Sequence, residues 1–459
     1  MEQNMKKEMK KEFSGLKEPS QWIAGIEWFF FIFANIVTIP LTVGKAFKLG
    51  QDSIITTLQL SFLVTGAACL LQAFIGHKRA ILEGQSGLWW GMILSIVSMA
   101  TAQGASLGEL GGSLTVGILI SAVLNIAIGL FGWGPAISKL FKPGVMAVFM
   151  LLFGIQLIQI FLKGMLGIPM GNAPDDAKIK LSVAALTFII AAIMIFINVK
   201  APTKYSKYSL LGGIVVGWIA YALIFGPEHS VKTDATFKFQ LFNLGKPAWN
   251  IGIIVMAVIT GLMNLANTFG ALKGTENLYD QETSKKQYKR SLTISGVLSG
   301  LGGLFGLVPY APFVSSIGFL EQSGIVKRLP FVIGSVLFFI MGLIPPAAHF
   351  FSNIPLSIGS MVLFVAYLQL LNSSMDFFKK IELNKRNVYR SAIPLFLAIV
   401  IMIMPDSYFS SLSKVVQPIF GNGLLMGILM ALILENVVKW NRIKPPSKNF
   451  NMFYPYVKG

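Results

Sequence analysis

Two short stretches, Glu83-Gly84-Gln85-Ser86-Gly87 and Pro309-Tyr310-Ala311-Pro312, each interrupt an otherwise apolar part of the sequence. The first holds two glycines and is followed by an apolar run, whereas the second holds two prolines. Glycine destabilises the interior of a helix, and proline cannot donate the backbone hydrogen bond that a helix needs. Both stretches therefore predict that the chain leaves the helical conformation in the middle of a hydrophobic segment.

The composition around these stretches is that of a membrane protein. Of the 459 residues, 54% are hydrophobic and only 13% are charged, whereas about a quarter of an ordinary soluble protein is charged. A membrane-spanning helix needs about 20 mostly apolar residues. We predict an all-α polytopic protein of fourteen spans, among them the first at 22–43, the third at 84–102, the eighth at 250–271 and the tenth at 309–325. These spans leave no room for a large soluble domain.

The distribution of positive charge predicts the topology. A net charge of +18 could indicate a nucleic-acid partner, but with fourteen spans and both termini inside, most of the 38 Lys and Arg residues fall on the cytoplasmic side. This is the positive-inside bias of membrane proteins, and we expect no nucleic-acid partner. Residues 1–20 lack the apolar stretch of a signal peptide. They are expected to form a cytoplasmic tail, as are residues 439–459, on a multi-pass protein of the cell membrane.

The two interruptions occupy matching places in the chain. A hydrophilic external segment at 226–249 divides the spans into two halves of seven, and each interruption begins the third span of its half. Unwound backbone inside a membrane persists only where it is buried in protein or lines a wet cavity. Transporters built from inverted repeats bind their solute at such breaks. Close helix packing through small residues is the alternative explanation, but the matching positions favour a solute site.

Polar residues near the interruptions indicate the kind of solute. Asn264 and Asn267 lie three residues apart on one face of the eighth span. An amide side chain carries both donors and an acceptor, so it can match the alternating edge of a nucleobase. We predict that a nucleobase or a similar small planar solute contacts Glu27, Gln85, Ser86, Gly87, Asn264, Asn267, Tyr310, Phe313, Ser315 and Ser316.

Carboxyl groups at membrane depth are costly and usually functional. Glu27 lies about one and a half turns into the first span, and we predict that it also carries a coupling proton; hydrogen bonding between helices is its alternative role. Glu83 is expected to reach the cytoplasmic face. Glu435 is expected to pair with Lys439, four residues further on in the same helix.

Several kinds of chemistry are missing from the sequence. There is no phosphate-binding loop, no paired Asp-Asp for magnesium and no nucleophile next to a histidine. The single cysteine, Cys69, offers no metal-ligand spacing. We therefore expect neither an enzyme nor a primary pump, and neither a metal nor a cofactor. An ion gradient, of protons or of another cation such as sodium, would supply the energy.

At these same places the sequence resembles the xanthine/uracil permease family, the nucleobase–cation symporters that include the nucleobase–ascorbate transporters. In the first span that family shows Gln-His, a proline thirteen residues after the Gln and a glycine four further on; here the frame is Glu27-Trp28, Pro40 and Gly44. In the tenth span it shows Glu or Gln followed by Asn-x-Gly-x-x-x-x-Thr; here the residues are Ser315-Ser316-Ile317-Gly318 and Ser323. The solute-binding glutamate of its eighth span corresponds to Asn267.

The resemblance implies a fold and a mechanism. It implies two inverted repeats of seven spans, with a short strand in spans 3 and 10. Spans 1–4 (21–132) and 8–11 (250–347) would form a core domain, and spans 5–7 (133–225) and 12–14 (348–438) a gate domain. The implied activity is import of a purine or pyrimidine nucleobase by proton symport, with alternating access between core and gate. An anion transporter of the related sulfate-type fold, sodium-coupled nucleobase uptake and a non-transporting sensor or scaffold are the alternatives. The sequence leaves the oligomeric state open, a homodimer included.

The predicted topology can be tested by labelling in intact cells. A single cysteine placed in segment 226–249, in a Cys69→Ser background, should react with a membrane-impermeant thiol reagent from outside, because an odd number of crossings separates this segment from the N-terminus. Reaction only after the cells are permeabilised would contradict the topology.

Overall fold

The computed structural model describes residues 14–102, 106–168, 177–206, 208–226, 240–382, 384–413 and 416–440. Residues 1–13 of the predicted N-terminal tail, 227–239 of the predicted external loop and 441–459 of the predicted C-terminal tail lie outside the described residues.

Helices make up most of the described chain, and two strands interrupt them. The first half contains η1 (Ser14–Lys17), α2 (Pro19–Ile36), α3 (Thr38–Ala46), α4 (Gln51–Phe74), β1 (Glu83–Gln85), α5 (Gly87–Ala102), α6 (Leu107–Leu130), α7 (Gly134–Ser138), α8 (Pro143–Met165), α9 (Leu181–Lys200), α10 (Thr203–Ser206) and α11 (Ser209–Phe225). The second half contains α12 (Ile251–Gly274), α13 (Lys285–Phe305), β2 (Tyr310–Pro312), α14 (Ser315–Ser323), α15 (Arg328–Gly342), α16 (Pro345–Ser352), α17 (Leu356–Tyr367), α18 (Gln369–Phe378), α19 (Lys385–Ile403), η2 (Asp406–Phe409), α20 (Gln417–Phe420) and α21 (Gly423–Asn436).

The helices have the length and composition of an integral membrane protein. Within the described ranges, eight are long and apolar enough to cross a membrane, or nine if α15 and α16, bent by 91°, count as one span. Three shorter apolar helices lie at Gly87–Val97, Gly212–Phe225 and Gly423–Asn436. The third predicted span begins with β1, so its helical part, α5, has only 16 residues and is too short to cross a membrane by itself. The count of fourteen spans therefore stays a prediction.

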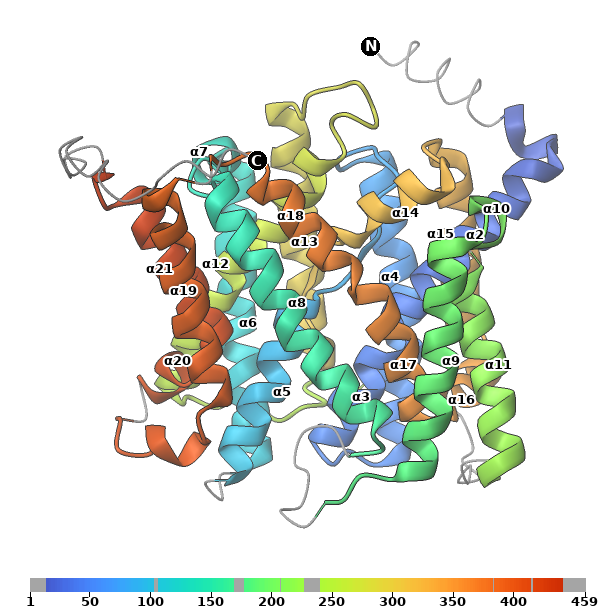
Figure 1. The fold of residues 1–459 in the computed structure, drawn as a ribbon, viewed down its shortest axis with the longest axis horizontal. Helices are drawn as coiled ribbons and strands as arrows, with labels where there is room; N and C mark the ends of the chain where they lie inside the picture. The colour runs from blue at the N-terminus through green and yellow to red at the C-terminus, as the bar shows by residue number, and fades with distance from the viewer. Residues whose placement is uncertain are drawn as a thin grey trace, which may run out of the picture.

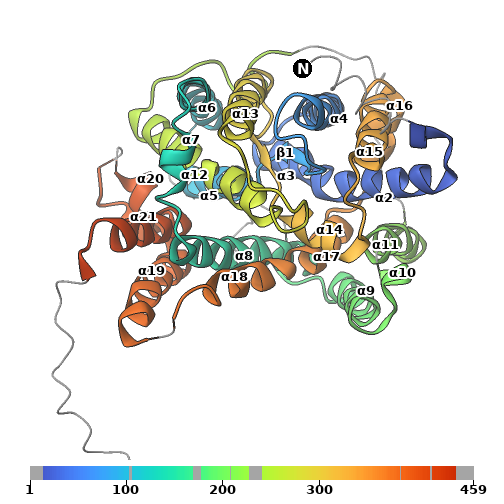
Figure 2. The same ribbon diagram turned by 90° about the horizontal axis from the view of Figure 1, so that it is seen from above.

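The long helices form two neighbouring layers (Figures 1 and 2). In one layer α6 packs against α12 and α13, and α15 packs against α2 and α4. In the other, α8 packs against α17, α18 and α21, and α17 also contacts α9 and α11. Seen from above, α8, α9, α17, α18, α19 and α21 lie along one side of the molecule, and α4, α6, α13 and α15 lie along the other (Figure 2).

The two strands pair with each other between the layers. β1 and β2 are antiparallel, with Glu83 opposite Pro312, Gly84 opposite Ala311 and Gln85 opposite Tyr310. They lie where the sequence predicted breaks in the third and tenth spans, and all their residues are buried. The pairing extends beyond the strands, because Ser86 N donates to Pro309 O (2.8 Å) and Phe313 N donates to Leu82 O (2.7 Å). Each strand thus satisfies backbone groups that the other would leave unpaired in the membrane.

Local signals set the ends of α13, which leads into β2. Ser284 and Gln287 form a capping box at its start: the Ser284 hydroxyl accepts from the Gln287 N–H (3.2 Å), and the Gln287 side chain accepts from the Ser284 N–H (2.9 Å). Gly306 ends the helix in the left-handed conformation, at φ +71°. The chain can then turn directly into the extended segment.

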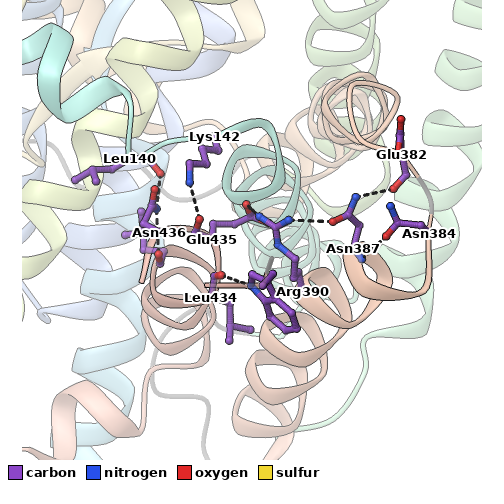
Figure 3. A network of polar contacts seen from close by, with 11 residues as sticks. Leu140, Lys142, Glu382, Asn384, Asn387, Arg390, Leu434, Glu435 and Asn436 are labelled. Atoms are coloured by element: carbon purple, nitrogen blue, oxygen red, sulfur yellow. Dashed lines mark hydrogen bonds and ion pairs between the residues drawn. The ribbon is translucent and has the colours of Figure 1, made fainter. Parts of the chain in front are cut away.

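A polar network fastens one end of α8, α19 and α21 (Figure 3). Arg390 of α19 forms an ion pair with Glu435 of α21, and Lys142, just before α8, donates to the Glu435 carbonyl oxygen (2.6 Å). The predicted pair between Glu435 and Lys439 is therefore wrong. Arg390 is distant in sequence, and only the packing of α19 against α21 brings it to the carboxylate.

The contact between α4 and α15 depends on a glycine. A Cβ atom added at Gly66 would lie 2.7 Å from the backbone N and Cα of Phe339, far inside van der Waals contact. Small residues allow helices to approach this closely in membranes.

Gly66→Ala should therefore lower the melting temperature of the purified protein, since overpacking of a close contact costs about 1–3 kcal/mol. Gly212→Ala is the matched control: nothing lies within 4 Å of a Cβ added there, and alanine favours a helix by about 1 kcal/mol over glycine. An equal melting temperature for Gly66→Ala and the wild type would show that the contact between α4 and α15 accommodates an added methyl group, and so does not depend on this glycine.

Candidate functional site

Three polar side chains meet where β1 ends and α12 passes. Ser86 Oγ donates to Asn264 Oδ1 (2.6 Å), and Asn267 Nδ2 donates to the same oxygen (2.9 Å) and to Ser86 Oγ (3.3 Å). Asn264 Nδ2 donates to the carbonyl oxygen of Tyr310 (3.1 Å), which ties α12 to β2. Asn264 uses both ends of its amide within the protein. Asn267 Oδ1 makes no hydrogen bond with the described part of the chain, so it can accept one from a solute.

A narrow pocket lies beside this oxygen. Asn267 and Ser315 both line it, and Ser315 Oγ is buried without a hydrogen-bond partner among the described residues. α5 begins at Gly87 and α14 at Ser315, so two helix N-termini, which carry partial positive charge, border the same pocket. Its lining is Ser86, Gly87, Phe153, Asn267, Ala311, Pro312, Phe313, Val314, Ser315, Tyr367 and Leu370. We call this the strand pocket.

A larger cavity adjoins the strand pocket. It has a volume of about 740 Å³, and residues of α2, α9, α14 and α17, together with Tyr208 just before α11, contribute to its wall. Ser315 and Tyr367 line both this cavity and the strand pocket, and also a third cavity that reaches Lys379 and Lys380 beyond α18. These two residues therefore stand where the spaces meet. We call the 740 Å³ cavity the vestibule.

Aromatic rings from both layers border the strand pocket. Phe313 follows β2, whereas Phe153 of α8 and Tyr367 of α17 come from the opposite layer. The rings of Phe153 and Tyr367 meet edge to face, with centroids 6.4 Å apart. We did not predict these two residues, because an aromatic residue in an apolar helix carries no local mark of function. The rings can stack on a planar solute.

Five predicted contact residues border the strand pocket: Ser86, Gly87, Asn267, Phe313 and Ser315. The structure does not bring Gln85, Asn264, Tyr310 and Ser316 into that lining.

For Gln85 of β1 and Tyr310 of β2, the reason is the alternation of side chains along a strand. The Gln85 side chain points away from the strand pocket, and its Nε2 donates to Ser61 Oγ of α4 (2.5 Å). The Tyr310 hydroxyl shares a hydrogen bond with Thr65 Oγ1 (3.1 Å). Ser316 Oγ accepts from Leu82 N (3.1 Å). These residues support the strands.

The carboxyl groups of Glu27 and Glu83 lie in environments that differ from each other. Glu27 lines the vestibule and accepts a hydrogen bond from the Tyr208 hydroxyl (3.1 Å). Glu83 is fully buried, with 0% of its surface exposed. The expectation that Glu83 reaches the cytoplasmic face is therefore wrong, since β1 carries it into the interior.

A buried arginine fixes the far end of α12. Arg79 Nη1 donates to Leu272 O (2.5 Å) and Nη2 donates to Gln281 O (2.7 Å). A cation at a helix C-terminus is favourable, and these bonds hold the helix that carries Asn267.

His77, two residues before Arg79 in the loop after α4, is buried, and burial lowers the pKa of its imidazole to about 3. His77 therefore stays neutral. In the described ranges, no group of three His, Cys, Asp or Glu side chains is placed to hold a metal ion.

Long apolar helices, paired strands at the start of two of the helices and a pocket that borders those strands are the features of an integral membrane transporter. The family model of the xanthine/uracil permeases, described as a permease family, matches residues 19–407. The chain belongs to the xanthine/uracil permease family, whose members are permeases and not enzymes.

Individual relatives match over nearly the whole chain. A putative purine permease of Bacillus subtilis, YwdJ, is 27% identical over 430 residues, which cover 92% of this chain and 97% of the relative. The xanthine permease of the same organism is 26% identical over 423 residues, or 90% and 92% of the two chains. Its uric acid permease PucK is 22% identical over 417 residues, or 90% and 94%.

Solved structures share the fold. The transmembrane domain of the cyanobacterial bicarbonate transporter BicA superposes with a TM-score of 0.57 at 17% identity and covers 91% of this chain and 96% of its own. The murine anion transporter Slc26a9, in its inward-facing state, superposes with a TM-score of 0.60 at 12% identity, covering 91% and 67%.

Proposed function

We propose that this permease is a secondary transporter that imports a nucleobase, with purines as the first candidates. The observation that carries the proposal is the strand pocket, where Asn267 Oδ1 on one wall and Ser315 Oγ on the other have no partner among the described residues. The strand pocket has a volume of about 20 Å³ and the adjoining vestibule about 740 Å³, so the edge of a base would enter the pocket while the rest of the base stays in the vestibule. A carbonyl acceptor and a hydroxyl match that edge, and Phe153, Phe313 and Tyr367 offer ring surface. Relatives described as purine, xanthine and uric acid permeases support the same substrate class.

We propose that one layer is a core domain and the other a gate domain. Residues 21–132 and 250–347 would form the core, and residues 133–225 and 348–438 the gate, in fourteen spans arranged as two inverted repeats. The packing of α6 with α12 and α13, and of α8 with α17, supports this division. Since Asn267 and Ser315 belong to the core and Tyr367 to the gate, movement of one layer past the other would close one access route and open another.

The vestibule would open to the cytoplasm. Lys379 and Lys380 border the adjoining cavity, and basic residues concentrate on the inner side of membrane proteins. The state described here would then face inward, with both termini cytoplasmic and the protein in the cell membrane. A homodimer is compatible with this arrangement.

A proton gradient would drive uptake, with Glu27 as the proton carrier. The family's carboxylates in spans eight and ten are Asn267 and Ser315 here, so neither can take up a proton. Glu27 lines the vestibule, where water can deliver one. Sodium coupling is the alternative, and uptake in a sodium gradient without a pH gradient would distinguish the two.

An anion is the second candidate substrate. The N-termini of α5 and α14 at the strand pocket would favour negative charge, and the solved structures with this fold include a bicarbonate transporter. However, no Lys or Arg is among the residues that line the strand pocket. Uptake of radiolabelled bases and inorganic anions into proteoliposomes decides between the two classes.

Asn267→Ala should weaken nucleobase binding about tenfold or more, because loss of a buried hydrogen-bond partner costs about 1–3 kcal/mol. Equilibrium binding of a labelled purine to the purified protein measures this. Asn436→Ala, at a half-buried asparagine of α21 that lines neither the strand pocket nor the vestibule, is the control and should keep wild-type affinity. Equal affinities for both variants would exclude a contact between the base and Asn267.

Glu27→Gln should retain exchange of nucleobase across proteoliposome membranes but lose accumulation driven by a pH gradient, because the amide keeps the shape of the carboxyl and cannot titrate. Counterflow and gradient-driven uptake, measured side by side, separate the two activities. Continued accumulation by the variant would assign the proton, or the coupling ion, to another site.

A further inference from the structure

A layer of polar side chains lies behind the strands, on the side away from the strand pocket. α4 and α13 contribute hydroxyl and amide groups at intervals of about one or two turns, and β1 and β2 place polar side chains against them. The members of this polar layer are Ser61, Thr65, Gln72, Glu83, Gln85, Ser291, Ser295, Ser299 and Tyr310, each less than a tenth exposed.

Glu83 is the one carboxyl group of the polar layer, and neutral side chains surround it. Ser295 Oγ donates to Glu83 Oε1 (2.6 Å), and Gln72 Nε2 donates to Glu83 Oε2 (3.1 Å). No Lys, Arg or His of the described chain forms an ion pair with it. The titratable groups that face it are Cys69 of α4, whose Sγ lies 3.4 Å from the Glu83 carbonyl oxygen, and Tyr310 of β2. Both groups are neutral in their ordinary forms.

The hydrogen bonds around Glu83 lack a donor. Gln72 Nε2 has two hydrogens but faces three acceptors, which are Glu83 Oε2, Ser291 O and Ser295 Oγ. Gln72 Oε1 is buried, with no donor in reach among the described residues. A hydrogen on Glu83 adds a donor: Glu83 Oε1 can donate it to Ser295 Oγ (2.6 Å), while Glu83 Oε2 still accepts from Gln72 Nε2 (3.1 Å). An ionised Glu83 would instead be a buried charge without a counter-charge, which is strongly unfavourable.

We propose that Glu83 is a proton-binding site that holds β1 against α4 and α13. With its proton, Glu83 joins Gln72 and Ser295 in a neutral network, and the strand is docked. When the proton leaves, the unpaired charge favours withdrawal of β1 from the polar layer.

The position of β1 matters for the solute. Three residues after Glu83, Ser86 hydrogen-bonds with Asn264 and Asn267, and α5 begins directly afterwards. Docking of the strand and formation of the strand pocket are therefore linked, and Glu83 acts as a positioning residue. This inference rests on the proposed function, since it makes formation of a nucleobase site depend on a proton.

The experiment compares the pH dependence of binding and of stability in the wild type, Glu83→Gln and Glu109→Gln. Glu109 is an exposed carboxyl in the first turn of α6 and serves as the matched control. Loss of one proton linked to binding weakens affinity about tenfold per pH unit. Purine affinity of the wild type and of Glu109→Gln should fall in this way as the pH rises. The fall should be smaller in Glu83→Gln, in which only Glu27 can still link a proton to binding.

The melting temperature without substrate provides a readout that does not depend on the solute. A group that is protonated when folded and ionised when unfolded makes the folded state less stable as the pH rises. This loss should appear in the wild type and be smaller in Glu83→Gln. Absence of purine binding at every pH, with the stability difference intact, would contradict the proposed substrate but not the proton site. Parallel pH profiles of stability in all three proteins would overturn the proton site.

Infrared spectroscopy covers the case in which Glu83→Gln does not fold. The wild type should show the carbonyl stretch of a neutral carboxylic acid at neutral pH, and Ser295→Ala should shift its frequency because it removes a hydrogen bond from Glu83. Lack of that band, or a band unchanged in Ser295→Ala, would overturn the proposal.

Discussion

Backbone groups cannot be left unpaired inside a membrane, and the antiparallel pairing of β1 with β2 meets that constraint for both broken helices at once. Neither strand could satisfy its own N–H and C=O groups, because an extended segment forms its hydrogen bonds with a neighbouring strand and not within itself. The rest of the interior depends on this pairing. It sets where α5 and α14 begin, and so it brings two helix N-termini to one pocket.

The same pairing separates two kinds of chemistry. Side chains on one side of the strands, continued by Ser86, face the space that a solute can reach. Side chains on the other side, such as Glu83 and Gln85, are enclosed by α4 and α13. Ser86, which lines the strand pocket, therefore directly follows Gln85, which belongs to the enclosed polar layer.

Fold and substrate class are separable in this protein. Solved structures of anion transporters share its fold at 12–17% identity, whereas relatives at 22–27% identity are described as permeases of purines, xanthine and uric acid. A common fold can serve different solutes because the side chains at the site select them. Here the strand pocket presents neutral amide, hydroxyl and aromatic groups, a set suited to an uncharged planar molecule.

Local sequence properties determined the membrane class, the two interruptions and the family. The length of an apolar run, a Gly-rich or Pro-rich break and a spaced motif can each be recognised without knowledge of any distant residue. Asn267 and Ser315 were predicted for the same reason, since each lies beside an interruption or matches a motif.

The tertiary structure alone decided which side of a strand a residue occupies. Gln85 therefore turned away from the pocket, and Glu83 became buried although basic residues precede it in sequence. It also decided which distant residues meet: Tyr367 and Phe153 at the pocket, and Arg390 at Glu435. Those contacts depend on how separate helices pack, and packing is a property of the whole chain that no short stretch of it contains.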